Sequence, residues 1–426
     1  MSNSKNNFIY IFLIVLSMTS FIYGFVVKED SAGGGLYDFN NTWNNQTTFN
    51  ENSLIKSLKN TKTAEISENI NSHFPFSYIL NKFLNPFSSN KENFKTSIFI
   101  LNFFVPLIFF FSLKNNYTKK NLYLLGCLSS ILYLSPYFRT SAYWAGMENY
   151  GLFMFVISFY FFSNYLKKRI NIKFNIILFS IFSCFCVYFD QKLLIIPLIY
   201  MFLFFKNEKN KDNIILYLIV NFILSIPVLS LIYYWGSVIS PHDTESRKFG
   251  NTLFLEQIGY CFSIILFYLS PYIFIYHKKI LQFLLKNKKI ILSLTIVFII
   301  YIISISLYPA DYGRWDPFGK GWLHKLSKIL FEDNLNQKIF TYFVFYISMI
   351  AIFITSQKRV VLIYFTLFFV FISSLILPIF QEYFDPLMLI FLTLFFYEEN
   401  EINDKFIKFH YFFSALFLIS LNLYYQ

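Results

Sequence analysis

The stretch FIYIFLIVLSMTSFIYGFV (residues 8–26) contains no charged side chain and is about as long as a bilayer-crossing helix, which needs roughly 20 apolar residues. Comparable apolar runs recur along the whole chain, near residues 94–113, 121–137, 150–166, 174–190, 193–205, 213–235, 257–276, 290–308, 339–356, 360–378, 386–397 and 408–425. The sequence therefore predicts an all-α, polytopic transmembrane helical bundle of about 11–13 spans. We expect residues 1–426 to form a single integral-membrane domain.

The composition argues against a water-soluble globular protein. Of the 426 residues, 56% are hydrophobic and 14% are charged, whereas soluble domains carry about 25% charged residues. The net charge of +12 does not predict a nucleic-acid partner, because basic residues of membrane proteins collect in cytoplasmic loops. The four cysteines all lie inside apolar runs, which predicts small core residues and not disulfides or metal ligands.

The distribution of basic residues predicts the orientation. With a cytoplasmic N-terminus, more than half of the 36 lysines and arginines fall at that terminus or in short inner connections, at 114–120, 167–173, 206–212, 277–289, 357–359 and 398–408. Three outer segments are then long, at 27–93, 236–256 and 309–338. No small-X-small cleavage site follows residues 8–26, so we expect a retained anchor.

The first outer segment is the longest, and within it residues 51–70 and 74–87 predict interfacial helices. It opens with SAGGGLYDFNNTW (residues 31–43), where the consecutive glycines allow the chain to turn back toward the membrane. Asp38 stands between Tyr37 and Phe39, and aromatic rings anchor at headgroup depth. A carboxylate partly withdrawn from water has a raised pKa and suits a general base.

Asp38 is therefore the first candidate base, and Asp30, nearer the end of the span, is the second. The alternative for Asp38 is a solvated loop residue or a helix cap. Glu29 is expected to be a plain interface residue.

Further candidates lie at later outer turns. His73 opens the apolar surface segment, where it is either an interfacial polar residue or a group that orients a phosphate or hydroxyl. Arg139 and Glu148 bracket an outer turn. They either form an ion pair across it or present a guanidinium to a lipid phosphate.

The stretch WGSVISPHDTESRKFG (residues 235–250) holds His242, Arg247 and Lys248, of which the last two suit phosphate contacts. His242, Asp243 and Glu245 are ligand types found in metal sites. No second source of ligands accompanies them, so we predict no metal and no other cofactor.

Two more stretches contribute candidates for substrate or phosphate binding. YPADYGRWDPFGKGWLHKL (residues 308–326) contains Arg314 and Lys320 in a loop with tryptophans and glycines. LPIFQEYFDPLML (residues 377–389) places Glu382 and Asp385 three residues apart, on one face if the segment is helical. Carboxylates at membrane depth are costly and usually functional.

These stretches resemble a known family. GGGLYDFNNTW (33–43), SHFPFSYIL (72–80), SPYFRTSAYWAGMENYGLFMF (135–155), YYWGSVISPHDTESRKFG (233–250) and QEYFDPLMLI (381–390) are similar to bacterial members of the GT-C superfamily of membrane glycosyltransferases, which includes protein O-mannosyltransferases. The family commonly has an acidic pair early in the first outer loop. Here Asp38 is followed by Phe39, and only Glu29 and Asp30 are adjacent acids, so the base is either Asp38 or Asp30.

The resemblance implies a bacterial inner-membrane enzyme with a cytoplasmic N-terminus. Its expected activity is inverting transfer of a sugar from a polyprenyl-phosphate donor to a hydroxyl of a lipid-linked or envelope glycan, or of a protein, on the periplasmic face. Two other classes stay open. One is an O-antigen or polysaccharide polymerase or ligase, which usually has its large outer loop late in the chain. The other is a transporter of lipid-linked glycans, which usually has internal repeats.

Overall fold

The computed structural model describes residues 2–66, 73–169, 171–241, 248–249, 254–309, 320–357, 359–377, 379–396 and 402–425. The chain divides into two compact units. Unit 1 comprises Met1–Ser246 and Tyr397–Gln426, and unit 2 comprises Arg247–Phe396. The single integral-membrane domain stays a prediction.

The described residues are almost entirely helical, which confirms the predicted all-α class. Their strand structure is one antiparallel pair of two-residue strands, β1 (Lys248–Phe249) and β2 (Ile376–Leu377). Seven helices are long and apolar enough to cross a membrane: α1 (Ser2–Val26), α5 (Lys91–Asn116), α9 (Ile172–Phe189), α11 (Lys211–Trp235), α13 (Leu255–Lys286), α14 (Lys288–Leu307) and α16 (Asn334–Ser356). The described residues therefore contain seven candidate membrane spans, and the higher predicted count stays a prediction.

The other predicted runs also fold as helices, although these are shorter or less apolar. They are α6 (Leu122–Ser130) with the 3₁₀ turn η1 (Ile131–Leu134), α8 (Glu148–Leu166), α10 (Ile195–Asn207), α17 (Val360–Leu375), α18 (Leu387–Phe391) with the π-turn η5 (Leu392–Phe396), and α19 (Ile407–Tyr425). Between them lie the 3₁₀ turns η2 (Gln191–Leu194), η4 (Gln381–Tyr383) and η6 (Asp404–Phe406).

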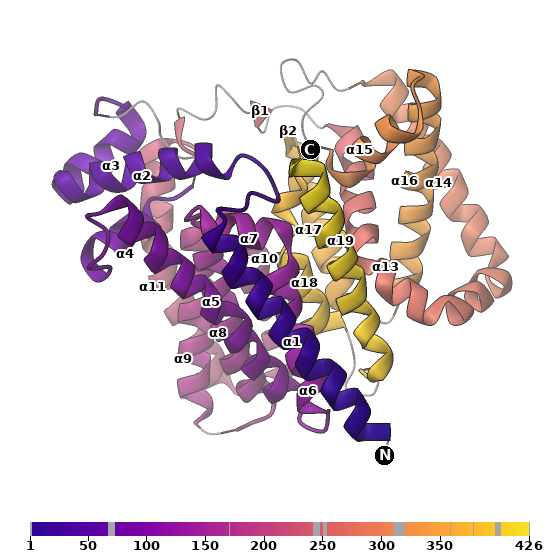
Figure 1. Cartoon of the computed structure of the whole chain (residues 1–426), viewed down its shortest axis with the longest axis horizontal. Coiled ribbons are helices and arrows are strands. Elements are labelled where there is room, and N and C mark those ends of the chain that lie inside the picture. Colours follow the sequence, from indigo (N-terminus) through magenta and orange to yellow (C-terminus); the bar gives the residue numbers. More distant parts are fainter. Residues whose placement is uncertain are drawn as a thin grey trace. The chain divides into compact units, whose positions relative to one another are not determined.

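In unit 1, the first outer segment forms three helices. Two of them lie within the stretches predicted to be interfacial helices, 51–70 and 74–87, and the sequence did not predict the one before them. α2 (Gly35–Glu51), α3 (Leu54–Thr63) and α4 (Phe76–Leu84) lie together on the side away from the N-terminus (Figure 1). The ammonium of Lys82 on α4 donates to the carbonyls of Phe49 at 2.5 Å and Asn52 at 2.6 Å, which ties α4 to the end of α2. Phe83 and Leu84 are 63% and 74% exposed, as an interfacial helix requires.

The predicted run at 121–137 ends earlier than expected. Ser135 accepts a hydrogen bond from the N–H of Phe138 at 3.2 Å, and Pro136 occupies the first turn of a separate helix, α7 (Pro136–Tyr143). A serine N-cap followed by proline is a strong helix start. Arg139 therefore lies in the middle of α7 and not at the end of a span.

Helix α19 runs beside α1 in unit 1 (Figure 1). Tyr10 donates to Asp404 at 2.9 Å near the start of both helices, and Ser17 lies 3.0 Å from a ring nitrogen of His410 further along. The two helices therefore point the same way, and the last helix of the chain covers the first.

In unit 2, α13 packs against α16 and α17, and the short helix α15 (Gly321–Leu330) packs against α13 and α16. α13 continues through a kink at Tyr276 to Lys286, although residues 277–289 are predicted to be a loop. Leu281 and Leu285 on this extension are exposed beside lysines, a pattern that suits a helix at a membrane surface.

Candidate functional site

The connection after α1 turns back into unit 1. The N–H of Glu29 donates to the carbonyl of Gly24 at 2.9 Å, and the N–H of Lys28 donates to that of Phe25 at 3.2 Å. Lys28 has a φ of 56°, in the left-handed region. This pattern is a Schellman turn, in which glycine is the usual residue at the left-handed position. The turn brings Glu29 and Asp30 against α7.

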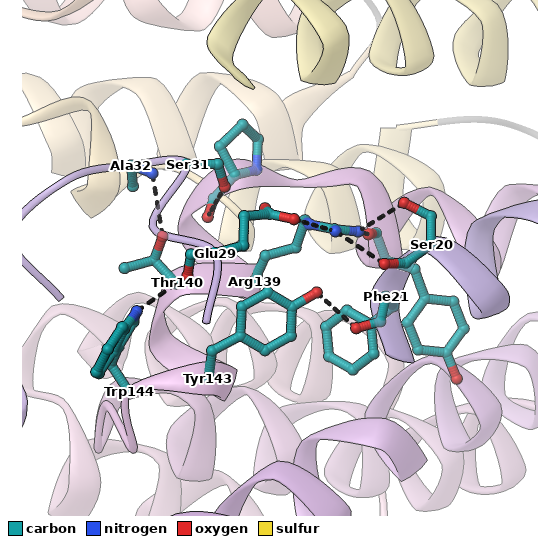
Figure 2. A network of polar contacts seen from close by, with 11 residues as sticks. Ser20, Phe21, Glu29, Ser31, Ala32, Arg139, Thr140, Tyr143 and Trp144 are labelled. Atoms are coloured by element: carbon teal, nitrogen blue, oxygen red, sulfur yellow. Dashed lines mark hydrogen bonds and ion pairs between the residues drawn. The ribbon is translucent and has the colours of Figure 1, made fainter. Parts of the chain in front are cut away.

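Glu29 and Arg139 form a buried ion pair at this turn (Figure 2). The Nε of Arg139 donates to Oε1 of Glu29 at 2.8 Å, and its Nη2 donates to Oε2. The side chain of Arg139 is 1% exposed and that of Glu29 is 4% exposed. A two-point contact of this kind is the strongest that a guanidinium makes with a carboxylate.

The remaining donors of Arg139 are directed at α1 and η1. They reach the carbonyl of Tyr133 at 2.7 Å and that of Ser20 at 3.0 Å, and the ring of Phe417 on α19 lies 4.1 Å from the guanidinium carbon. The proposed ion pair with Glu148 is therefore wrong. Phosphate binding by Arg139 stays a prediction. Its guanidinium already contacts one carboxylate and two carbonyls.

α7 also holds the backbone of the connection. The N–H of Ala32 donates to the hydroxyl of Thr140 at 3.0 Å, and the indole N–H of Trp144 donates to the carbonyl of Glu29 at 3.0 Å (Figure 2). Ser31 adds a hydrogen bond of 3.4 Å to the carbonyl of Pro136. Residues 29–32 are thus fixed by α7 at several points.

Asp30 lies on this fixed connection and is half-buried. Its Oδ2 accepts from the N–H of Gly35, the first residue of α2, at 2.9 Å. Burial raises the pKa of Asp30 above its usual range, and hydrogen bonds from Gly35, Gly33 and Thr140 partly oppose that rise. A raised pKa makes this carboxylate a stronger base than a solvated one.

Asp38 has a different environment. It lies in the first turn of α2 and is exposed. The positive end of the helix dipole stabilises a carboxylate at this position. Its catalytic role stays a prediction, but the structural features expected of the base belong to Asp30.

Gly35 provides a direct test of the connection. A Cβ there would lie 2.7 Å from Cγ of Trp144, and the indole N–H of the same ring donates to the carbonyl of Glu29. We expect Gly35→Ala to lower the free energy of unfolding by about 1–3 kcal/mol, the usual effect of overpacking. Thermal unfolding of the purified protein measures this change. The matched control is Ala32→Gly, which removes a methyl group from the same connection, and an unaltered stability of Gly35→Ala would contradict the close packing described.

Two lysines near the start of α5 lie over aromatic rings beside this connection. The ammonium of Lys95 lies 3.9 Å from the centre of the Trp144 ring and 5.7 Å from that of Phe39. The ammonium of Lys91 lies 5.3 Å from the Phe39 ring. The sequence interpretation missed both lysines, because a basic residue at a span end is the ordinary topological pattern.

His73 and Glu148 come together in unit 1. Their Nε2 and Oε1 atoms are 3.7 Å apart, and Nδ1 of His73 is 3.1 Å from Oε1 of Gln191. Asp190 and Lys192 form an ion pair of 3.3 Å beside Gln191. The cluster joins the starts of α4 and α8 with the end of α9. The roles of His73 and Glu148 in substrate binding stay predictions.

The remaining candidates belong to unit 2 or lie outside the described residues. Lys320 is buried before α15, and its N–H donates to the carbonyl of Ile379 at 2.7 Å.

Glu382 is exposed in η4, whereas Asp385 is buried and accepts from the hydroxyl of Tyr268 at 2.8 Å. The two acids do not share a helical face, because η4 ends at Tyr383 and Asp385 lies beyond it. Lys248 lies in β1. The predictions for His242, Arg247 and Arg314 fall outside the described residues.

Among the described residues, no three His, Cys, Asp or Glu side chains gather as metal ligands would. The suggested cation ligands Asp243 and Glu245 lie outside these residues, together with His242.

Comparison with known proteins assigns no family: no family model, no curated protein and no solved structure matches this chain.

Proposed function

We propose that the protein transfers a sugar, with inversion at the anomeric carbon, from a polyprenyl-phosphate donor to an acceptor hydroxyl at the outer face of the membrane. The observation that carries the proposal is Asp30, a half-buried carboxylate with a raised pKa just beyond α1. Perturbed carboxylates on rigid supports are typical of general bases.

In the proposed reaction, the acceptor hydroxyl gives its proton to Asp30 as its oxygen bonds to the anomeric carbon. The bond from that carbon to the phosphate oxygen breaks on the opposite side, and polyprenyl phosphate leaves with the electron pair. Polyprenyl phosphate is a good leaving group, so the reaction needs no general acid. Glu29 and Arg139 act as positioning residues, because their ion pair fixes the connection that carries Asp30.

Negative charge grows on the departing phosphate, and cations near the base would stabilise it. Lys95 and Lys91 suit this role, since Lys95 lies on the face of Trp144, whose N–H bonds the residue before Asp30. The exposed apolar residues Leu36 and Tyr37 on α2, at 55% and 71% exposure, suit a surface that rests on lipid. A donor could then keep its tail in the bilayer.

The experiment is to reconstitute the purified protein in nanodiscs with polyprenyl-phosphate sugars labelled in the sugar, and to supply membrane extracts as acceptors. The proposal expects label to leave the lipid and join an acceptor one sugar at a time, with inverted configuration. Growth of a long polymer would favour the polymerase class. Movement of intact labelled lipid across vesicles without bond cleavage would favour a transporter. Either result would overturn the proposal.

A further inference from the structure

Unit 2 contains a pocket that the proposed function does not use. Its volume is about 400 Å³, within the range of ligand sites. The lining comes from the first part of α13, from α15 and from the first part of α16, and its polar side chains include Glu256, Lys320, Lys328, Asn334, Gln337 and Lys338. α13 and α16 are candidate spans, and the pocket lies at one end of both. This places it at headgroup depth.

The pocket carries a positive charge. Lys320, Lys328 and Lys338 face it, against the single carboxylate of Glu256 among the lining residues. The amide of Asn334 supplies neutral hydrogen-bond donors, and the amide of Gln337 donates one N–H to the carbonyl of Phe331 at 2.8 Å and has a second N–H. Ammonium groups combined with such donors match the oxygens of a phosphate.

Lys320 is held in place by its backbone. It has a φ of 66°, in the left-handed region, which glycine adopts readily and a residue with a side chain adopts only with strain. Its N–H donates to the carbonyl of Ile379 at 2.7 Å. The next residues are also fixed, since Trp322 donates from its backbone to Gln381 at 2.9 Å and from its indole to the carbonyl of Ser263 at 3.0 Å. A strained, buried lysine held by such contacts is typical of a functional site.

The helices around the pocket also expose apolar side chains. Ile329 on α15 is 69% exposed, and Leu335 and Ile339 on α16 are 65% and 58% exposed. On helices that end at headgroup depth, such residues contact acyl chains. The pocket thus combines a cationic interior with an apolar exterior on the same helices.

We propose that this pocket binds the phosphate group of an anionic membrane lipid, with Lys320 and Lys328 as its principal contacts. The same chemistry would hold free inorganic phosphate, so the test has to separate the two sources. The site is independent of the proposed sugar transfer, and its test uses no sugar donor.

The test is a calorimetric titration of the delipidated protein in detergent with three probes: dihexanoyl phosphatidylglycerol, dihexanoyl phosphatidylcholine and inorganic phosphate. We expect saturable binding of phosphatidylglycerol, at least tenfold tighter than that of phosphatidylcholine or inorganic phosphate. Lys320→Gln and Lys328→Gln should each weaken it about tenfold, corresponding to about 1.4 kcal/mol. Lys325→Gln is the matched control, because Lys325 is exposed on α15 and does not line the pocket.

Lys328→Gln keeps the test valid if Lys320→Gln fails to fold, since Lys328 is exposed in the last turn of α15. Inorganic phosphate binding as tightly as phosphatidylglycerol would overturn the lipid as the source. The site would be overturned if neither phosphatidylglycerol nor inorganic phosphate bound saturably. Equal losses of affinity in the Lys328 and Lys325 variants would also overturn it.

Discussion

Replacing Asp30 with asparagine is expected to slow sugar transfer by about 10²–10⁴-fold, the usual contribution of a general base. Asparagine keeps the size of the side chain and an oxygen that can accept from the N–H of Gly35, now at 2.9 Å from Oδ2. It cannot take the acceptor proton at neutral pH. The measurement is the initial rate of label release from polyprenyl-phosphate sugar by the reconstituted variant, compared with the unsubstituted protein.

Two further variants show whether the loss belongs to Asp30. Glu51→Gln removes an exposed carboxylate from the far end of α2 and should leave the rate unchanged. Asp38→Asn distinguishes the two bases that the sequence suggests, and we expect it to retain most of the activity because Asp38 is exposed. A large loss in Asp38→Asn with full activity in Asp30→Asn would reverse the assignment.

Loss of fold would not explain the expected effect of Asp30→Asn. Burial raises the pKa of Asp30 in the folded protein, so the protonated form contributes stability that is fully present below the unfolded pKa. This contribution is lost as the pH rises through the folded pKa. At neutral pH the charged carboxylate therefore costs stability, and the asparagine variant should unfold at the same temperature or higher. A lower unfolding temperature would show that Asp30 is mainly structural.

Replacing Glu29 with glutamine should lower the free energy of unfolding by about 3–5 kcal/mol, because it leaves the buried charge of Arg139 without its counter-charge. Denaturant or thermal unfolding in detergent measures this change. The double variant Glu29→Leu with Arg139→Met should recover most of the loss, since it removes both charges from the interior. We also expect Glu29→Gln to slow sugar transfer, because the connection that carries Asp30 loses its main anchor.

The matched control for this pair is Glu92→Gln, which neutralises an exposed carboxylate in the first turn of α5. Surface substitutions of this kind usually change stability by less than about 0.5 kcal/mol. If Glu29→Gln were no more destabilising than Glu92→Gln, the ion pair would not fix the connection.

The helical fold could be predicted from the sequence because the bilayer sets a strict length for apolar runs. Each predicted run contains a helix or short helical segments in series, although β2 occupies the end of the run at 360–378. The differences from the predicted helix bounds have two local causes. At 121–137 the cap at Ser135 and Pro136 starts a new helix, and after Tyr276 an apolar face extends α13 through residues that resemble a charged loop.

The candidate site was only partly predictable, because its central contact joins residues 110 positions apart. Glu29 looked like an ordinary interface residue, and nothing in its neighbours indicates that Arg139 lies opposite it. The sequence ranks Asp38 before Asp30 as the base, whereas the proposed mechanism ranks Asp30 first, and the ranking stays a prediction. The aromatic residues beside Asp38 suggested burial, but Asp38 is exposed on α2, whereas Asp30, just after the turn at Lys28, is half-buried. The adjacent acids Glu29 and Asp30 at the end of the span are the sequence feature that could have indicated the site.

The most direct test of the central claim is the pH dependence of kcat/KM for sugar transfer, which reports the pKa of the essential base in the free enzyme. Asp30 must lose its proton to act, so the rate should rise with pH through an apparent pKa above the ordinary carboxyl value of about 3.9. This acidic limb should disappear in the residual activity of Asp30→Asn. The same limb, at full rate, in the asparagine variant would contradict the account.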